Sequence, residues 1–356
     1  MHHLGQLEQT FYWMEEEQFL FKMKTYIKAI SYYLPDYNLN NAVIEHQFPE
    51  WSIDKIASKT GINNRHIVAS DETAVDMAVK AAETLFLEHN IDKDEIDFLI
   101  LCTQSPDYFL PTSACIIQER LGLNTSIGAF DINLGCSGFV YGLGIAKGLI
   151  STGQAKNILF ITSETYSKFI HPKDKSNKTI FGDAAAATLI STTGFAEIGN
   201  FEYGTDGKGA ENLIVKNGGL RNYKKQSEIV IDEFNNYISD DYLYMNGSEI
   251  FLFTLSAVPK LIHATLIKND LTIADIDLFV FHQANRYMLE NLRKKVNIPE
   301  GKFYLYIENC GNTVSSTIPI ALYHAQKDNL ILSGKKLLLA GFGVGYSWAG
   351  TVLEIK

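Results

Sequence analysis

The sequence predicts a layered α/β protein built from two similar halves. Short strands that are apolar throughout, such as Phe98–Cys102 and Leu278–Phe281, alternate with amphipathic helices, and the alternation restarts after residue 196. Strands of this kind are typical of sheets that helices cover on both faces. A length of 356 residues suits two domains or one large duplicated one. We therefore expect an α/β/α/β/α arrangement of layers.

The first half, residues 23–196, supplies its elements in the order that this architecture needs. Apolar residues at helical spacing and continuously apolar runs distinguish its helices from its strands. The predicted strands are 26–33, 98–102, 128–133, 158–162 and 184–191, and the predicted helices are 73–89, 113–121 and 138–151. Residues 1–22 lack a basic first segment and carry three consecutive glutamates, so they are predicted to be an N-terminal extension and not a signal peptide.

The second half, residues 197–356, repeats the pattern after a polar, glycine-rich stretch. That stretch, 203–240, is predicted to form loops and strands of an insertion. The predicted helices are 247–268, 286–296 and 315–326, and the predicted strands are 278–281, 337–340 and 349–355.

Composition excludes several classes of function. A net charge of −10 argues against general nucleic-acid binding, which needs a basic face. The sequence contains no run of about 18 uninterrupted apolar residues, so no membrane span is predicted. The four cysteines form no CxxC pair, so neither a metal site nor a redox pair is indicated. Mostly buried free thiols and a cytoplasmic location are expected.

The first motif with chemical potential is Gly135-Cys136-Ser137-Gly138, at a predicted strand-to-helix turn. A helix N-terminus lowers a thiol pKa through its dipole and its free N–H groups, which predicts a reactive Cys136. Flanking glycines allow a tight turn and a close approach of substrate. The alternative is a small buried cysteine in a glycine-rich turn.

Three further motifs lie at the ends of predicted elements. His282 ends a strand, where α/β sites form and where a histidine can act as acid, base or hydrogen-bond donor. Asn312 follows Gly311 in a loop that leads into a helix. The glycine-rich turn Gly341–Gly345 exposes backbone N–H groups that can stabilise an oxyanion. Each has a structural alternative: a satisfied core histidine, an ordinary helix cap and a plain turn between strands. Together they suit acyl transfer through a thioester.

At this point the sequence resembles the ketoacyl-ACP synthase III family of the thiolase-like fold, over essentially 24–356. His282 and Asn312 are thirty positions apart, as in that family. The markers are Lys59-Thr60-Gly61-Ile62, Leu134–Phe139, Phe181–Ala186, Met245-Asn246-Gly247, His282–Asn285, Gly311-Asn312-Thr313 and Gly341–Gly345.

The resemblance implies a decarboxylative Claisen condensation that forms 3-oxoacyl-ACP in fatty-acid or related lipid biosynthesis. Cys136 would carry the acyl group, and His282 and Asn312 would bind the thioester carbonyl of malonyl-ACP and stabilise the enolate. The backbone N–H groups of Cys136 and Val344 would form the oxyanion hole. The resemblance implies no metal and no tightly bound cofactor, with acyl-CoA or acyl-ACP and malonyl-ACP as substrates.

The same resemblance places substrate and partner contacts. The acyl pocket would be lined by Phe181, Met245, Phe251 and Phe342. Lys55 and Lys59 stand where a Trp and an Arg would hold the adenine of CoA, and lysines cannot stack as those residues do. The implied contacts with the acyl carrier protein or CoA are Lys55, Lys59, Lys175 and the helix residues Arg286, Arg293, Lys294 and Lys295. The segment 107–111 implies a homodimer.

Two other functions remain open on the sequence. An acyltransferase of the same fold would pass the acyl group from Cys136 to an oxygen or nitrogen nucleophile, which the retained His282 and Asn312 disfavour. A non-catalytic partner subunit would have no need of the retained Cys136. Acyl chain length, branching and the pathway stay open.

Overall fold

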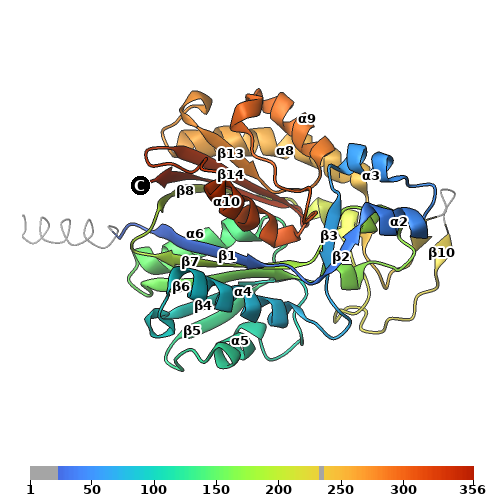
Figure 1. The fold of residues 1–356 in the computed structure, drawn as a ribbon, viewed down its shortest axis with the longest axis horizontal. Coiled ribbons are helices and arrows are strands. Elements are labelled where there is room, and N and C mark those ends of the chain that lie inside the picture. Colours follow the sequence, from blue (N-terminus) through green and yellow to red (C-terminus); the bar gives the residue numbers. More distant parts are fainter. Residues whose placement is uncertain (1–22, 232–235) are drawn as a thin grey trace, which may run out of the picture.

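The computed structural model describes residues 23–231 and 236–356. Among these, nine strands form one mixed sheet in the order β13-β14-β15-β8-β1-β7-β6-β4-β5 (Figure 1). Antiparallel pairing of Tyr26 with Glu197 and of Ile27 with Ala196 joins the two halves along β1 and β8. The strands are β1 (Tyr26–Tyr33), β4 (Phe98–Cys102), β5 (Gly128–Ile132), β6 (Asn157–Glu164), β7 (Ala184–Ser191), β8 (Ala196–Thr205), β13 (Leu278–Phe281), β14 (Lys336–Gly343) and β15 (Ser347–Ile355).

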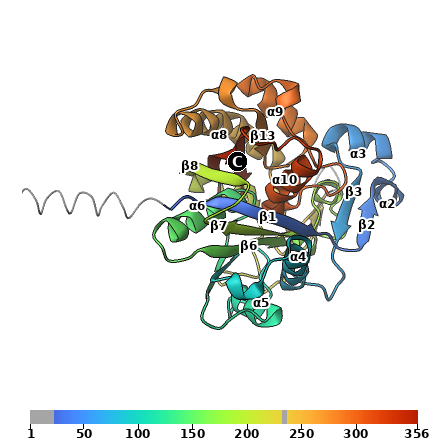
Figure 2. The same cartoon turned by 60° about the vertical axis from the view of Figure 1, so that its left-hand side comes forward.

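Helices cover both faces of each half of the sheet and produce the predicted five layers. The central layer consists of α6 (Gly138–Ser151) and α10 (Thr317–Lys327), whose apolar side chains share one core with strands of both halves. The outer layers are α4 (Ala74–His89) with α5 (Ser113–Leu121), and α8 (Gly247–Lys268) with α9 (Arg286–Val296). Figures 1 and 2 show the two outer pairs on opposite sides of the molecule. The predicted α/β/α/β/α architecture is confirmed.

Smaller elements surround one end of the layers. Strands β2 (Tyr37–Asn40) and β3 (Asn64–Ile67) form an antiparallel pair, and the chain between them folds into α2 (Asn41–Gln47) and α3 (Ile53–Thr60). This unit lies beside α9 and α7 (Lys175–Lys178). The segment after β8 forms two-residue strands: β9 (Leu213–Ile214), β10 (Val230–Ile231), β11 (Tyr237–Ile238) and β12 (Tyr244–Met245). The 3₁₀ turns are Lys93–Glu95, Tyr166–Phe169, Gly207–Asn212, Ile273–Asp275, Glu300–Lys302 and Val314–Ser316.

The predicted elements occur where expected, several of them with ends that differ by one to three residues, and three of the differences have a clear physical reason. The predicted helix 315–326 begins later, at Thr317, because Ser315 and Ser316 belong to a 3₁₀ turn that starts at Val314, whose φ of 56° lies outside the α-helical region. Strand β8 runs to Thr205, so the predicted insertion begins later than residue 203. Strand β14 continues to Gly343 because the glycine-rich segment pairs with β15 before it turns. The predicted extension 1–22 lies outside the described residues.

Helix α8 is long and apolar enough to cross a membrane by length and composition alone, the one such helix in the part of the chain that is described. Its buried side chains, among them Val258, Leu261 and Ile262, pack in the core cluster that includes residues of α9, β13 and β14. One face of α8 therefore packs on the sheet of the second half, against β8, β14 and β15.

Candidate active site

Cys136, His282 and Asn312 line one cavity of about 160 Å³. Cys136 belongs to the first half of the chain, and His282 and Asn312 belong to the second. Cys136 lies between β5 and α6, His282 directly follows β13, and Asn312 precedes the turn that leads into α10. Residues from distant parts of the sequence therefore meet where the halves face each other.

The expected low pKa of Cys136 is wrong for the unliganded protein. Burial, with a smaller contribution from the neighbouring Glu164, raises the pKa of this thiol to about 12. Backbone N–H groups of Cys136 and Val344 form hydrogen bonds that act in the opposite direction. The thiol is only 5% exposed, so the loss of hydration outweighs the helix N-terminus.

The end of β14, at Gly343, lies directly against the nucleophile. A Cβ atom added to Gly343 would lie 2.7 Å from Cys136 Cβ and 2.9 Å from Sγ, so only glycine fits at this position. The Val344 side chain packs towards Gly135, where an added Cβ would be 2.8 Å from Val344 Cγ1. The predicted oxyanion groups, the N–H of Cys136 and of Val344, thus both reach the sulfur.

His282 is buried, and burial lowers its pKa to about 3, against a smaller effect of the Val314 carbonyl. The imidazole is therefore neutral at physiological pH. Its Nδ1 lies 2.8 Å from Thr317 Oγ1. Because His282 also lines the cavity, Nε2 is the ring nitrogen available to a ligand there.

Asn312 is held by the residue two positions later. Val314 N–H donates to Asn312 Oδ1 over 2.9 Å. With its oxygen occupied, the amide can present Nδ2–H₂, a donor, to the cavity.

A buried carboxyl group beside the nucleophile was not predicted. Glu164 ends β6, is fully buried, and accepts hydrogen bonds from Gln104 N–H, Ser105 Oγ and Ser315 Oγ. Burial raises its pKa to about 8, so the group is largely protonated at neutral pH. The sequence does contain a signal for this group: the apolar run of β6 ends in three polar residues, Thr162-Ser163-Glu164.

The wall of the cavity agrees with the sequence at three of four expected positions. Phe181, Met245 and Phe342 line it. Phe251 does not: it stacks on Tyr287, with ring centroids 5.5 Å apart, and packs with the outer cluster around α8 and α9. One helix position earlier, Ile250 faces the cavity instead. Leu213 and Ile180, which were not predicted, complete the apolar wall.

The lysines of α3 gather around a tryptophan. Lys55 Nζ lies 4.8 Å and Lys59 Nζ 5.7 Å from the centre of the Trp51 ring. Lys55 and Lys59 are four positions apart on one face of α3, and Trp51 precedes the N-cap Ser52 of this helix. Lys175 pairs with Glu50 at 3.0 Å, and its side chain is 12% exposed.

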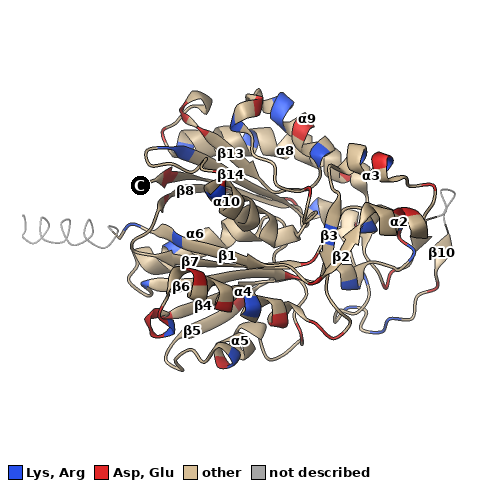
Figure 3. Cartoon of the chain, in the orientation of Figure 1, with Lys and Arg blue, Asp and Glu red and all other residues tan. Residues whose placement is uncertain are grey.

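The basic residues of α9 do not form one patch, contrary to expectation. Arg286, at the N-terminus, packs against Gly61, the C-cap of α3. Arg293 pairs with Glu290 at 2.8 Å. Lys294 and Lys295 are exposed in the last turn, about 12 Å further along the axis at 1.5 Å per residue. Figure 3 shows the separate basic positions along α9.

A five-layered α/β fold with a cysteine, a histidine and an asparagine in one cavity defines a thiolase-like condensing enzyme. The sequence model "3-Oxoacyl-[acyl-carrier-protein (ACP)] synthase III" matches residues 130–207, and the model of its C-terminal part matches residues 266–355.

Relatives extend the match to nearly the whole chain. The beta-ketoacyl-[acyl-carrier-protein] synthase III of Clostridium tetani is 34% identical over 90% of this chain and 96% of its own length. A crystal structure of a 3-oxoacyl-(acyl-carrier-protein) synthase III is 49% identical, with a TM-score of 0.91, over 93% of this chain and 100% of that one. The corresponding synthase of Burkholderia xenovorans is 38% identical, with a TM-score of 0.86, over 93% and 94%. The chain belongs to the beta-ketoacyl-ACP synthase III family and is an acyltransferase of the condensing type.

Proposed function

We propose that Cys136, His282 and Asn312 carry the family's decarboxylative condensation in this chain. The observation behind the proposal is that all three line one buried cavity, with two backbone N–H groups at the cysteine sulfur. The reaction joins an acyl thioester to malonyl-ACP, releases carbon dioxide and forms 3-oxoacyl-ACP in fatty-acid synthesis. It needs only protein groups and the two thioesters.

In the first half-reaction, Cys136 Sγ attacks the acyl thioester and the donor thiol leaves. The N–H groups of Cys136 and Val344 stabilise the oxyanion of the tetrahedral intermediate. In the second, the malonyl C–C bond breaks and carbon dioxide leaves. His282 and Asn312 donate hydrogen bonds to the enolate oxygen. The enolate carbon attacks acyl-Cys136, the C–S bond breaks, and the cysteine is regenerated.

For the carrier, we propose that Lys59 and Arg286 form the part of the surface that meets the phosphopantetheine arm or the acidic carrier protein. Arg286 packs on Gly61, two residues after Lys59, and the neighbouring Asn285 lines the cavity. These cations therefore lie next to the site, whereas Lys294 and Lys295 lie at the far end of α9. Trp51 lies close to both Lys55 and Lys59 and supplies a flat apolar surface on which an adenine can stack. This surface is compatible with the use of acyl-CoA donors.

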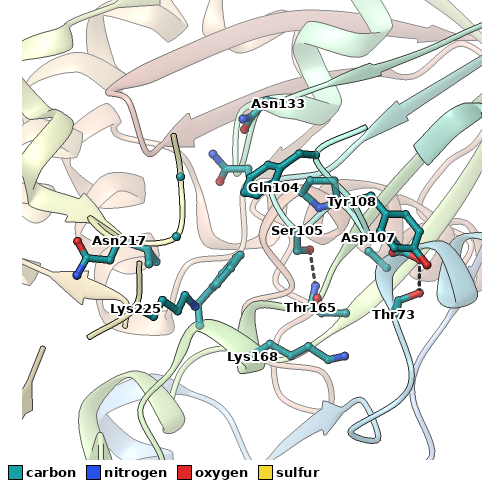
Figure 4. A pocket seen from close by; sticks show the side chains of 17 residues that line it. Thr73, Gln104, Ser105, Asp107, Tyr108, Asn133, Thr165, Lys168, Asn217 and Lys225 are labelled. Atoms are coloured by element: carbon teal, nitrogen blue, oxygen red, sulfur yellow. Dashed lines mark hydrogen bonds between the residues drawn. The ribbon is translucent and has the colours of Figure 1, made fainter. Parts of the chain in front are cut away.

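For the assembly, we propose a homodimer in the cytoplasm. Tyr108, Phe109 and Leu110 are 62%, 74% and 82% exposed, and Tyr108 and Phe109 border a cavity of about 770 Å³ (Figure 4). A hydrogen bond from Thr73 Oγ1 to Asp107 holds the start of this segment. Apolar side chains presented in this way favour an interface with a second copy.

The test is intact-mass spectrometry after incubation with acyl-CoA and acyl-ACP donors, followed by malonyl-ACP. We expect a mass gain that Cys136→Ala abolishes, then release of carbon dioxide and formation of 3-oxoacyl-ACP. Acylation followed by transfer to an oxygen or nitrogen nucleophile without carbon dioxide would identify the other acyltransferase function. A folded protein that takes no acyl group would indicate a non-catalytic partner subunit.

A further inference from the structure

The hydroxyl group of Thr317 forms a hydrogen bond with the His282 imidazole. It is the side-chain group bonded to Nδ1 of the imidazole, at 2.8 Å, and it also lies 3.0 Å from the carbonyl oxygen of Val314. Thr317 is 2% exposed and His282 is 2% exposed. Since water has little access, the hydroxyl and this carbonyl decide which ring nitrogen carries the proton.

A hydroxyl has one proton and here two acceptors compete for it. If it points to the Val314 carbonyl, Thr317 accepts from Nδ1–H, and Nε2 presents a lone pair to the cavity. If it points to Nδ1, the imidazole carries its proton on Nε2 and presents a donor. The neutral ring can have only one of these forms at a time.

The enolate oxygen needs the donor form. Asn312 is arranged on the same principle, because Val314 N–H occupies its oxygen and leaves Nδ2–H₂ for the ligand. If Nε2 carried a lone pair, two acceptors would lie opposite each other, and His282 would repel the enolate oxygen and not stabilise it.

We propose that Thr317 is a positioning residue that donates its hydroxyl proton to Nδ1 and thereby fixes His282 as the Nε2–H tautomer for decarboxylation. This inference rests on the proposed function of His282. It makes no demand on the acylation of Cys136, which uses the backbone N–H groups of the other turn.

The decisive variant is Thr317→Val, which keeps the shape of the side chain and removes the hydroxyl. The variant removes the hydroxyl that donates to Nδ1, and the Val314 carbonyl that bonds the ring can only accept, so the ring is expected to move its proton from Nε2 to Nδ1. We expect malonyl-ACP decarboxylation to fall about 10²- to 10³-fold, the loss typical of one removed oxyanion donor. Acylation of Cys136 by the same donor should change less than about threefold, which also reports that the variant is folded. Thr317→Ser restores the hydroxyl and should recover most of the decarboxylation.

Nitrogen-15 NMR of imidazole-labelled protein reads the tautomer directly. The expected result is Nε2–H in the wild type and in Thr317→Ser, and Nδ1–H in Thr317→Val. A wild type with Nδ1–H, or a Thr317→Val variant that decarboxylates at the wild-type rate, would overturn the inference. Failure of the wild type itself to be acylated or to decarboxylate malonyl-ACP would instead refute the proposed function.

Discussion

Val314 N–H donates a 2.9 Å hydrogen bond to Oδ1 of Asn312, and a backbone φ of 56° at Val314 makes this geometry possible. A β-branched residue rarely adopts such a conformation, which costs about 1–3 kcal/mol. Val314 is fully buried against Cys136 and Phe181 in an apolar cluster, so packing offsets the strain. The strained residue is thus the one that orients the amide in the cavity.

Asn312→Asp should separate the two half-reactions. The carboxylate can still accept from Val314 N–H, but its second oxygen brings an acceptor and a negative charge to the enolate. We expect malonyl-ACP decarboxylation to fall about 10²- to 10³-fold while Cys136 is still acylated. Release of labelled carbon dioxide and intact mass measure the two steps.

The control for charge is Asn309→Asp, in the exposed part of the same loop, where the side-chain oxygen accepts from Asn64. If both variants lost decarboxylation equally, the assigned role of Asn312 would be wrong.

Gly343→Ala should block acylation. The added Cβ would lie 2.9 Å from the sulfur of Cys136, and the adjoining backbone of β14 and β15 leaves it little room to move. We expect the mass gain from acyl donors to disappear, with a destabilisation of about 1–3 kcal/mol from overpacking. Gly301→Ala, where an added Cβ meets nothing within 4 Å, is the matched control. Normal acylation of Gly343→Ala would show that the end of β14 is not held against the thiol.

The alkylation of Cys136 should depend steeply on pH. Because burial raises its pKa to about 12, the thiolate fraction grows about tenfold per pH unit across the alkaline range. Iodoacetamide labelling of the free enzyme, followed by peptide mass spectrometry, should therefore show a rate that still rises at pH 10. Labelling of the exposed Cys115 in the same digest monitors the reagent. A plateau between pH 7 and 8 would mean that the helix N-terminus prevails over burial.

Glu164→Gln should flatten the pH dependence of stability. The folded protein keeps the Glu164 proton up to about pH 8, whereas an unfolded glutamate ionises near 4.3. This group therefore stabilises the fold fully below about pH 4, and the contribution is lost as the pH rises towards 8.

Between about pH 5 and pH 8, the free energy of unfolding of wild type should fall more steeply than that of Glu164→Gln, by up to about 1.4 kcal/mol per pH unit. Urea denaturation of both proteins at three pH values in this range measures the difference. Parallel curves would show that Glu164 is ionised in the folded protein.

Arg286→Glu should weaken the use of ACP substrates. Reversal of a charge beside the cavity is expected to raise KM for malonyl-ACP about tenfold, with kcat little changed and with a smaller effect at high salt. Lys295→Glu makes the same charge change at the other end of α9 and should leave KM within about twofold. Equal effects of the two variants would favour attraction by net charge over a defined contact.

Much of this protein is determined locally by its sequence. Apolar runs such as Leu278–Phe281 favour strands buried on both faces, and glycines beside Cys136 favour a tight turn that substrate can approach. The ordered motifs also identified the three residues that meet in the cavity. These properties depend on neighbours along the chain, which the sequence displays directly.

Tertiary structure alone decided the electrostatics and the fine contacts. The pKa of Cys136 depends on how completely the two halves exclude water, and the position of Phe251 depends on the rotation of α8 by a single residue. That the Arg286 end of α9, and not the Lys295 end, lies beside the cavity follows from where α3 packs on α9. Burial and helix rotation result from many distant contacts at once, so no local pattern in the sequence carries them.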